Sequence, residues 1–411
     1  MMNNLQEALK RVKLIVKHPG NLITTNGLIF IFAVASGGIV ANLYYAQTLL
    51  SPIGHSINLA PSLIGFIVTF IQWGYVVGLL FIVPLVDFAE NRRLIVTLLC
   101  LSCLFLFGLV FIKTSMIFLL FCFLLGVSLV APPIMLPFAS YILPVEKHGQ
   151  AIGKIMSGVL FGIMFARPLA SGLTEIFSWK AIFIFSAVFM AILACLFYYL
   201  LPKRTPKHQL SYWTLLSSMP IILKSYPVLR RRALYHALLF GIFCLFWSSV
   251  AMLLSSHIFH YSQGQIALFA FAGATGGFAA PIAGRIADRG WIRPGTAIAI
   301  IIVILAFIIA KISGEHSVIA LVISALLLDI GVAGNVVLGQ KALFSLEPEI
   351  RGRLNSLYVA SFFMGGAVGS AMAGYLFAHW GWGYITDLGV AVSMVAFIYF
   401  LSEVFSSRSN K

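Results

Sequence analysis

The sequence predicts an all-α membrane protein with twelve transmembrane helices in two pseudo-symmetric six-helix bundles. Three observations lead to this fold class. The 411 residues are 61% hydrophobic and only 9% charged, a balance far from that of soluble domains. Twelve apolar runs, each long enough to cross a bilayer, follow one another along the chain. The connector after the second run resembles the connector after the eighth, about half a chain later.

The net charge of the chain is +15. In a soluble protein this charge would indicate a nucleic-acid ligand. In a membrane protein it indicates loops that lie beside the anionic face of the bilayer. We therefore expect contact with membrane lipid and none with nucleic acid. We also expect no cleavable signal peptide, because the first residues are polar and basic and no small-residue cleavage site follows a short early apolar run.

The N-terminal half begins with a basic leader, residues 1–22, and continues as a predicted bundle over residues 23–201. A helix rises about 1.5 Å per residue, so about 20 apolar residues cross the hydrocarbon layer. The runs of this length lie at about residues 27–50, 61–86, 94–113, 115–143, 149–176 and 180–201.

A basic connector, residues 202–232, separates the two predicted bundles and contains no acidic residue. Its segment Tyr212–Leu223 is expected to be an interfacial helix, since Trp213 and the flanking cations suit a headgroup boundary. The second bundle spans residues 233–405, and residues 406–411 form a tail. Its runs lie at about residues 233–258, 263–287, 294–313, 316–346, 352–379 and 383–405.

The distribution of cations predicts the orientation of the chain in the membrane. Nearly all of the 27 lysines and arginines lie in the termini and connectors of one side. The opposite side has only Lys113, Lys180 and Lys311. Because positively charged loops remain in the cytoplasm, we expect a multi-pass protein of the bacterial inner membrane with both termini cytoplasmic.

The two halves contain related motifs. PLVDFAENRR, residues 84–93, follows the second run, and PIAGRIADRG, residues 281–290, follows the eighth. Each motif places an acid, Asp87 or Asp288, before a group of cations. A repeat of this period is typical of a transporter built from two similar bundles around a central site.

Asp329 lies near the middle of the apolar run from Val318 to Phe344. An ionised carboxylate at that depth costs roughly 3 kcal/mol on insertion scales, so such residues usually face a cavity and serve a function. We predict that Asp329 carries the proton of a coupled transport cycle, because loss of hydration favours its protonated form. The alternative is a structural role, in which Asp329 is paired or protonated and ties two helices together.

Arg167 is a cation within an apolar run rather than in a connector. It precedes Pro168, which removes a helix hydrogen bond and is expected to bend the helix. An arginine at membrane depth must reach a cavity, a carboxylate or free carbonyl groups. Contact with the substrate or the coupling proton is one interpretation. The other is that Arg167 extends outward or binds the carbonyls released by Pro168.

Polar and aromatic side chains at helical spacings predict the lining of a shared cavity. Such groups suit a ligand with both polar and apolar parts. For each residue taken singly, a hydrogen bond between helices or an anchoring role at the membrane interface is the alternative. The predicted lining consists of Asn42, Tyr45, Gln72, Arg167, Trp247, Asn335, Gln340 and Tyr358.

Several segments spread over nearly the whole chain resemble one transporter family. The first half has ANLYYAQTLL at 41–50, GLLFIVPLVD at 78–87, ENRRLI at 90–95, MLPFASYI at 135–142 and GKIMSGVLFGIMFARPLASG at 153–172. The second half has AGRIADRG at 283–290, LLLDIGVAGN at 326–335 and RLNSLYVASFFMGGAVGS at 353–370. The chain is thereby identified as a member of the major facilitator superfamily. It is similar to the drug/metabolite:proton antiporter branch that includes arabinose-efflux-type permeases. The resemblance implies a central cavity, alternating access and proton coupling.

The same resemblance implies a gating motif. The matching residues are Asp87 and Arg92 in the first half and Asp288 and Arg289 in the second. Asp87 is expected to meet the N-terminus of the eleventh helix, where free N–H groups favour an anion. The chain departs from the family pattern at Phe88, where the family often has Arg.

Two further departures concern the fourth and fifth runs. The Arg that usually precedes Gly126 on the fourth run is absent, so a proton pathway that uses it does not carry over to this chain. The glycine-rich fifth run has Ala166-Arg167-Pro168 in place of a Gly-Pro pair. Its remaining small residues, such as Gly158 and Gly162, are expected to let helices approach closely.

Nothing in the sequence predicts an enzyme, a metal site or a cofactor. No phosphate-binding GxxxxGK[ST] loop is present, so ATP is not the expected energy source. The prediction is a proton-coupled secondary transporter that exports a small molecule by alternating access and acts as a monomer. The alternatives are an importer of an anionic metabolite or a siderophore-like metal chelate, with Arg167 as counter-charge, and a non-transporting membrane sensor.

Overall fold

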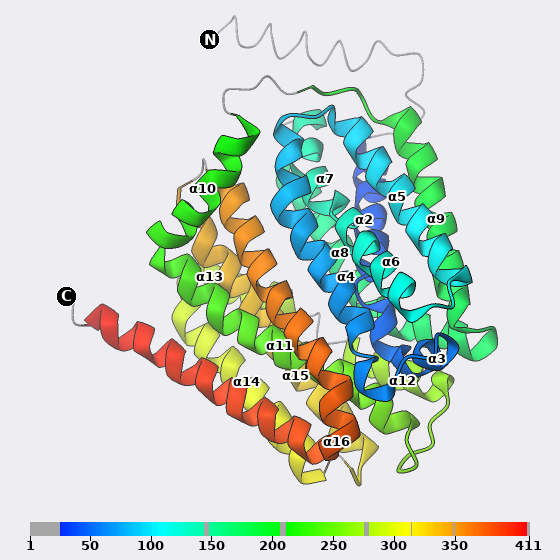
Figure 1. Cartoon of the computed structure of the whole chain (residues 1–411). Coiled ribbons are helices and arrows are strands. Elements are labelled where there is room, and N and C mark those ends of the chain that lie inside the picture. The colour runs from blue at the N-terminus through cyan, green and yellow to red at the C-terminus, as the bar shows by residue number, and fades with distance from the viewer. Residues whose placement is uncertain are drawn as a thin grey trace, which may run out of the picture.

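A computed structural model describes residues 25–143, 148–205, 211–274, 279–313, 315–347 and 350–408. The basic leader lies outside the described residues, as do residues 206–210 of the connector and residues 409–411 of the tail. Every regular element in the described ranges is a helix. Figure 1 shows these helices as two groups, one formed by each half of the chain.

The first group contains the elements from α2 to α9. Its first crossing is interrupted, because the helix ends at Ala41 and a turn at residues 42–44 precedes a short 3-10 helix. The second crossing changes to a π-helical turn and then a 3-10 turn before the connector. The bounds are α2 Thr25–Ala41, η1 Tyr45–Thr48, α3 Leu50–Ser56, η2 Pro61–Leu63, α4 Phe66–Val77, η3 Gly78–Ile82, η4 Val83–Asp87, α5 Asn91–Phe111, α6 Ser115–Ser128, α7 Ala131–Ile142, α8 His148–Ile176 and α9 Trp179–Leu200.

The connector contains the predicted interfacial helix, here α10, with Trp213 75% exposed. The next helix starts at Pro227, six residues before the predicted span, because a proline fits the first turn of a helix. The bounds of the second half are α10 Tyr212–Ser225, α11 Pro227–Ser255, α12 Gln263–Ala274, α13 Ala279–Asp288, α14 Ile292–Ser313, α15 Val318–Phe344 and α16 Arg351–Arg408.

The described helices account for twelve membrane crossings. Nine are long and apolar enough to cross a membrane. One of these nine, α16, contains two crossings, because Gly381 has a φ of 72° that breaks the helix in its middle. The other two crossings are α2 with η1 and α3, and α12 with α13. The predicted fold class is confirmed.

The two bundles repeat one packing arrangement. In the first, α2 and α8 approach so closely that a Cβ at Gly158 would clash with the Ala33 carbonyl. In the second, α11 and α16 approach in the same way, and a Cβ at Gly365 would clash with the Ala237 carbonyl. The first and fifth crossings thus pack like the seventh and eleventh, through small residues that bring backbones together.

The bundles also contact each other, at the end of the molecule opposite the α4–α5 connection. Thr69 on α4 donates to the Ala367 carbonyl on α16 at 3.0 Å, and Gly65 leaves no space for a Cβ against the Ser370 carbonyl. The Gly264 N–H donates to Glu175 Oε2 at 2.9 Å. We call these contacts the seal. The end that holds the α4–α5 connection and α10 is the connector end, toward which the two groups of ribbons diverge (Figure 1).

Candidate substrate cavity

A cavity of about 230 Å³ lies between the two bundles, on the connector side of the seal. The first bundle lines it with α7, α8, the turn after α2 and the second crossing, and the second bundle with α11, α15 and α16. Each long helix contributes a stripe, because residues three and four apart share a face. The stripe on α15 consists of Asp329, Val332, Ala333, Val336 and Gln340.

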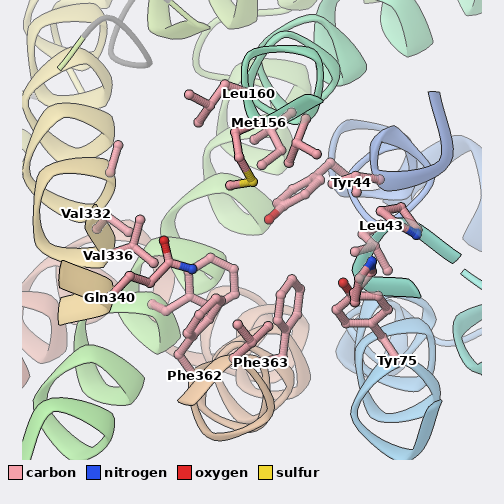
Figure 2. A pocket seen from close by; sticks show the side chains of 18 of the residues that line it. Leu43, Tyr44, Tyr75, Met156, Leu160, Val332, Val336, Gln340, Phe362 and Phe363 are labelled. Carbon is pink, nitrogen blue, oxygen red and sulfur yellow. The ribbon is translucent and has the colours of Figure 1, made fainter. Parts of the chain in front are cut away.

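Aromatic rings make up much of the cavity wall. Tyr75 and Phe363 meet edge to face across the boundary between the bundles, with centroids 4.7 Å apart. Phe362 and Phe363 stack with centroids 5.0 Å apart. Figure 2 shows Tyr44 and Gln340 reaching into the cavity from opposite bundles, with Phe362 and Phe363 along the wall between them. An apolar surface with a few polar groups is the usual character of a small-molecule site.

Arg167 lies at the end of the cavity nearest the seal and is 2% exposed. Its guanidinium carbon is 4.0 Å from the ring centroid of Trp247, and the rings of Phe243 and Tyr44 lie at 5.1 and 5.4 Å. Its Nε donates to Oε1 of Gln47 at 2.8 Å. Each ring contributes about 0.5–2 kcal/mol to holding such a cation. Within the described part of the chain, Nη2 has no acceptor.

Asp329 is half-buried and lines the same cavity. A Cβ added at Gly273 would lie 3.5 Å from Asp329 Oδ2 and 2.6 Å from the Trp247 ring, so the carboxyl lies beside the indole. Arg167 and Asp329 therefore flank one indole and lie within each other's electrostatic field. Among the described residues they form no ion pair, and Oδ2 accepts no hydrogen bond of ordinary geometry.

A buried polar layer connects the bundles beyond Arg167. Gln72 Nε2 lies 3.2 Å from Sγ of Cys244, and Gln47 Nε2 lies 3.9 Å from the same sulfur. Gln47 thus contacts both Arg167 and the second bundle. Separation of the bundles at this level would remove one of the contacts that orient Gln47, so the position of Arg167 is linked to the closed seal.

His236 contributes a second polar group to the cavity. Its Nδ1 lies 2.6 Å from Nδ2 of Asn335, so Nδ1 accepts when the amide donates. The imidazole stacks on Tyr358 and meets Phe362 edge-on, with centroids 5.5 and 4.8 Å apart. In the described chain, His236 Nε2 has no hydrogen-bond partner. These contacts leave Nε2 as the ring atom available to a ligand.

The structure places the predicted lining residues in different locations. Arg167 and Gln340 line the cavity, and Gln340 donates to Asn355 Oδ1 at 3.1 Å. Trp247 supports Arg167, and Gln72 belongs to the polar layer at the seal. Asn42 accepts from Ser186 at 2.7 Å inside the first bundle. The others, Tyr45, Asn335 and Tyr358, are buried outside the set of described residues that line the cavity.

Tyr44 and His236 are among the lining residues that the sequence reasoning did not select. Tyr44 lines the cavity in place of Tyr45, because the turn at residues 42–44 changes the helical register. His236 lies more than two turns inside α11, because this helix starts earlier than predicted, and its side chain lines the cavity. The proline at position 227 was the available sequence signal for the earlier start.

The motif residues at the connector end have different surroundings. Arg92 Nη1 donates to the carbonyls of Tyr198 at 3.2 Å and Leu201 at 3.5 Å, so it caps the C-terminus of α9. Asp288 pairs with Lys341 at 2.7 Å within the second bundle, and Arg289 is exposed. Asp87 is exposed, and no described residue gives it a hydrogen bond or ion pair. The expected contact of Asp87 with the eleventh helix is absent from the described residues in this state.

No group of three or more His, Cys, Asp or Glu side chains in the described ranges could hold a metal ion.

A family model described as Major Facilitator Superfamily matches residues 27–340 and 259–411. The chain belongs to the Major Facilitator Superfamily. It is a multi-pass membrane protein and a secondary transporter of this superfamily, whose substrates are small molecules.

Curated relatives of this superfamily member carry transporter names. The uncharacterized transporter YgaY of Escherichia coli O157:H7 is 37% identical over 368 residues, which cover 90% of this chain and 93% of that protein. A probable sugar efflux transporter of Pasteurella multocida (strain Pm70) is 24% identical, with 90% of this chain and 91% of that protein covered.

Solved structures of the superfamily have the same fold. A D-xylose-proton symporter superposes with a TM-score of 0.72 at 11% identity, covering 91% of this chain and 96% of its own. The nucleoside transporter NupG superposes with a TM-score of 0.71 at 14% identity, covering 91% and 98%. At these identities the likeness shows the fold alone.

Proposed function

We propose that this protein is a proton-coupled exporter of a small molecule in the bacterial inner membrane, with Asp329 as the proton-carrying group. The observation that supports this proposal is the position of Asp329, which lines the central cavity. Among the described residues its Oδ2 has no hydrogen bond of ordinary geometry and its carboxyl forms no ion pair. A titratable group at membrane depth that faces a cavity is a functional candidate by default.

The transport cycle follows from differential binding. A ligand shifts a conformational equilibrium only by the difference of its affinities for the two states. The proton would favour one facing state by neutralising Asp329, and the substrate would favour the other. Arg167 and Asp329 line the same cavity, and Gln47 links Arg167 to the seal. Through Gln47, the charges of Arg167 and Asp329 in the cavity would be coupled to the opening and closing of the seal.

Export is supported by two considerations. The cation distribution predicts that the connector end is cytoplasmic, so the cavity of this state would accept substrate from the cell interior. A relative at 24% identity is named a probable sugar efflux transporter. The direction of transport in this chain is part of the proposal.

A second candidate is import of an anionic metabolite with Arg167 as its counter-charge. The buried Nη2 of Arg167, unpartnered within the described residues, favours this possibility. Import of an anion with a proton would move both solutes in the same direction. Export by exchange would move them in opposite directions, so the sign of the proton flux separates the candidates.

The test uses Asp329→Asn, which retains the shape of the protonated carboxyl but releases no proton. A thermal-shift screen of the wild type first selects a bound compound, since binding stabilises by RT ln(1 + [L]/Kd). In proteoliposomes, the variant should exchange this compound down its gradient but should not accumulate it after a pH jump. Asp387→Asn is the matched control, because Asp387 is exposed and pairs with Lys311 outside the cavity. Accumulation by folded Asp329→Asn would refute the proton role of Asp329.

A further inference from the structure

The cavity presents one cationic and one anionic group with unused hydrogen-bonding capacity. Arg167 Nη2 and Asp329 Oδ2 are both buried. Within the described ranges Nη2 has no acceptor, and Oδ2 has only the neighbouring Trp247 indole, without ordinary hydrogen-bond geometry. Arg167 is only 2% exposed, so bulk water does not reach most of it. Buried polar atoms are almost always paired in proteins, and an unpaired one requires an explanation. A ligand that supplies both partners is such an explanation.

The two charges are held apart. Arg167 lies on the face of the Trp247 ring, and Asp329 lies beside the same residue. When Arg167 and Asp329 are both ionised, their charges sum to zero, and a ligand with a single charge then faces a like charge. An anion at Arg167 faces the Asp329 carboxylate, and a cation at Asp329 faces the guanidinium. A ligand that carries both charges avoids this repulsion, which is how a site rejects the wrong partner.

The rest of the cavity restricts the ligand body. Its wall contains the rings of Phe240, Phe243, Phe362 and Phe363, which favour an apolar group. Its volume of about 230 Å³ is below the roughly 300–1,000 Å³ of sites for drug-sized ligands. The body is therefore compact and apolar.

We infer that the substrate is a compact zwitterion, an amino acid or a similar amino acid-like molecule with an apolar side chain. Its anionic group binds Arg167 and its ammonium group binds Asp329. This inference rests on the proposed function, because an ammonium at the ionised carboxylate competes with the proton for the same group. Competition of this kind is the differential binding that proton exchange requires.

Several titratable or polar groups face Asp329 or share its cavity. Trp247 of α11 lies beside the carboxyl, and Arg167 of α8 and Tyr44 of the turn at residues 42–44 lie within its electrostatic range. His236 of α11 and Tyr75 of α4 line the same cavity. Histidine is the side chain that ordinarily titrates between pH 5 and 8. The variant His236→Gln therefore separates the contribution of His236 to the pH dependence of binding from that of Asp329.

The experiment measures binding to the purified full-length protein with a matched set of probes. L-Phenylalanine carries both charges, phenethylamine only the ammonium and 3-phenylpropanoate only the carboxylate, on the same ring. L-Leucine replaces the ring with a branched chain, and L-arabinose is an uncharged polar probe. Each probe is titrated by thermal shift at pH 6 and pH 8, with calorimetry for those that bind.

The expected result is that L-phenylalanine or L-leucine binds at least tenfold more tightly than the single-charge probes. Binding should weaken from pH 8 to pH 6, by at most about tenfold per pH unit for one competing proton. The pH dependence should persist in His236→Gln and disappear in Asp329→Asn. Arg167→Gln should lose the preference of the zwitterion over phenethylamine, and Arg167→Lys should retain part of it. Arg93→Gln, at an exposed surface position, should behave as wild type.

Tighter binding of phenethylamine, 3-phenylpropanoate or L-arabinose, or no binding of either amino acid, would overturn the inference. If one of those probes binds with a pH dependence that Asp329→Asn removes, the inference fails while the proton role of Asp329 stands. If an amino acid binds equally at both pH values and moves no proton in proteoliposomes, the proposed function fails. The two failures are therefore distinguishable.

Discussion

The guanidinium of Arg167 lies over the indole of Trp247, with its central carbon 4.0 Å from the ring centroid. The carboxyl of Asp329 lies beside the same side chain. Trp247 thus supports both charges of the cavity. A cation stacked on a ring needs no direct carboxylate contact to remain buried, so the burial of Arg167 does not require an ion pair with Asp329.

A double-mutant cycle tests the stacking of Arg167 on Trp247. Arg167→Gln and Trp247→Leu should each destabilise the protein, and together they should cost less than the sum. The expected coupling is about 1–2 kcal/mol, the size of a desolvated cation–π interaction. Thermal unfolding in detergent measures it. Trp247→Leu combined with Arg93→Gln should be additive within about 0.5 kcal/mol, as for distant sites. If the destabilisations of Arg167→Gln and Trp247→Leu were additive, the stacking would contribute nothing to the stability of the protein.

Gly65→Ala should shift the protein away from the state with a closed seal. A Cβ at this position would clash with the Ser370 carbonyl of the opposite bundle, and overpacking typically costs about 1–3 kcal/mol. Spin labels at Lys180 and Lys311, near the seal end of each bundle, should report longer distances. Gly172→Ala is the control, because no described atom lies within 4 Å of its Cβ position. An unchanged distance distribution in Gly65→Ala would contradict the structural assignment of the seal.

Asp87→Asn should favour the state with an open connector end. In the described residues of this state Asp87 is exposed and unpaired. Removal of its charge should therefore leave the free energy of this state unchanged. If Asp87 meets the N-terminus of the eleventh helix in the opposite state, its loss should change the ratio of states by about two- to fivefold. Spin labels at the connector ends of the two bundles measure this ratio. Asp288→Asn, which breaks a pair within one bundle, should leave it unchanged. A shift toward a closed connector end would refute the assignment.

The predicted orientation can be tested by labelling. In a variant without the five native cysteines, Lys203→Cys should react with a membrane-impermeant reagent only from the cytoplasmic side. Lys113→Cys, which lies at the other end of the first bundle, should react only from outside. Both positions are exposed, so access rather than burial decides the result. Outside labelling of Lys203→Cys would reverse the topology and make the cavity of this state face outward.

The crossings and the unusual charges could be predicted from the sequence alone. Hydrocarbon requires each crossing to be an apolar and mainly helical segment, and length and composition are local properties of the chain. Local composition also distinguishes Asp329 and Arg167 from the other charged residues, because a charge within an apolar run is rare and energetically costly wherever its side chain points. Even the glycines of the fifth crossing indicated close packing, which the structure shows at Gly158.

The tertiary structure decided which side chains meet. Tyr44 lines the cavity instead of Tyr45 because the helix is broken at residues 42–44, and a break rotates all later residues. Asn42 turns to Ser186 because α9 packs beside it, a contact between residues far apart in the chain. The placement of Arg167 on Trp247, and the closure of the bundles at one end, depend on how two separate bundles fit together. Periodicity along one helix contains no information about that fit, since it describes each helix alone.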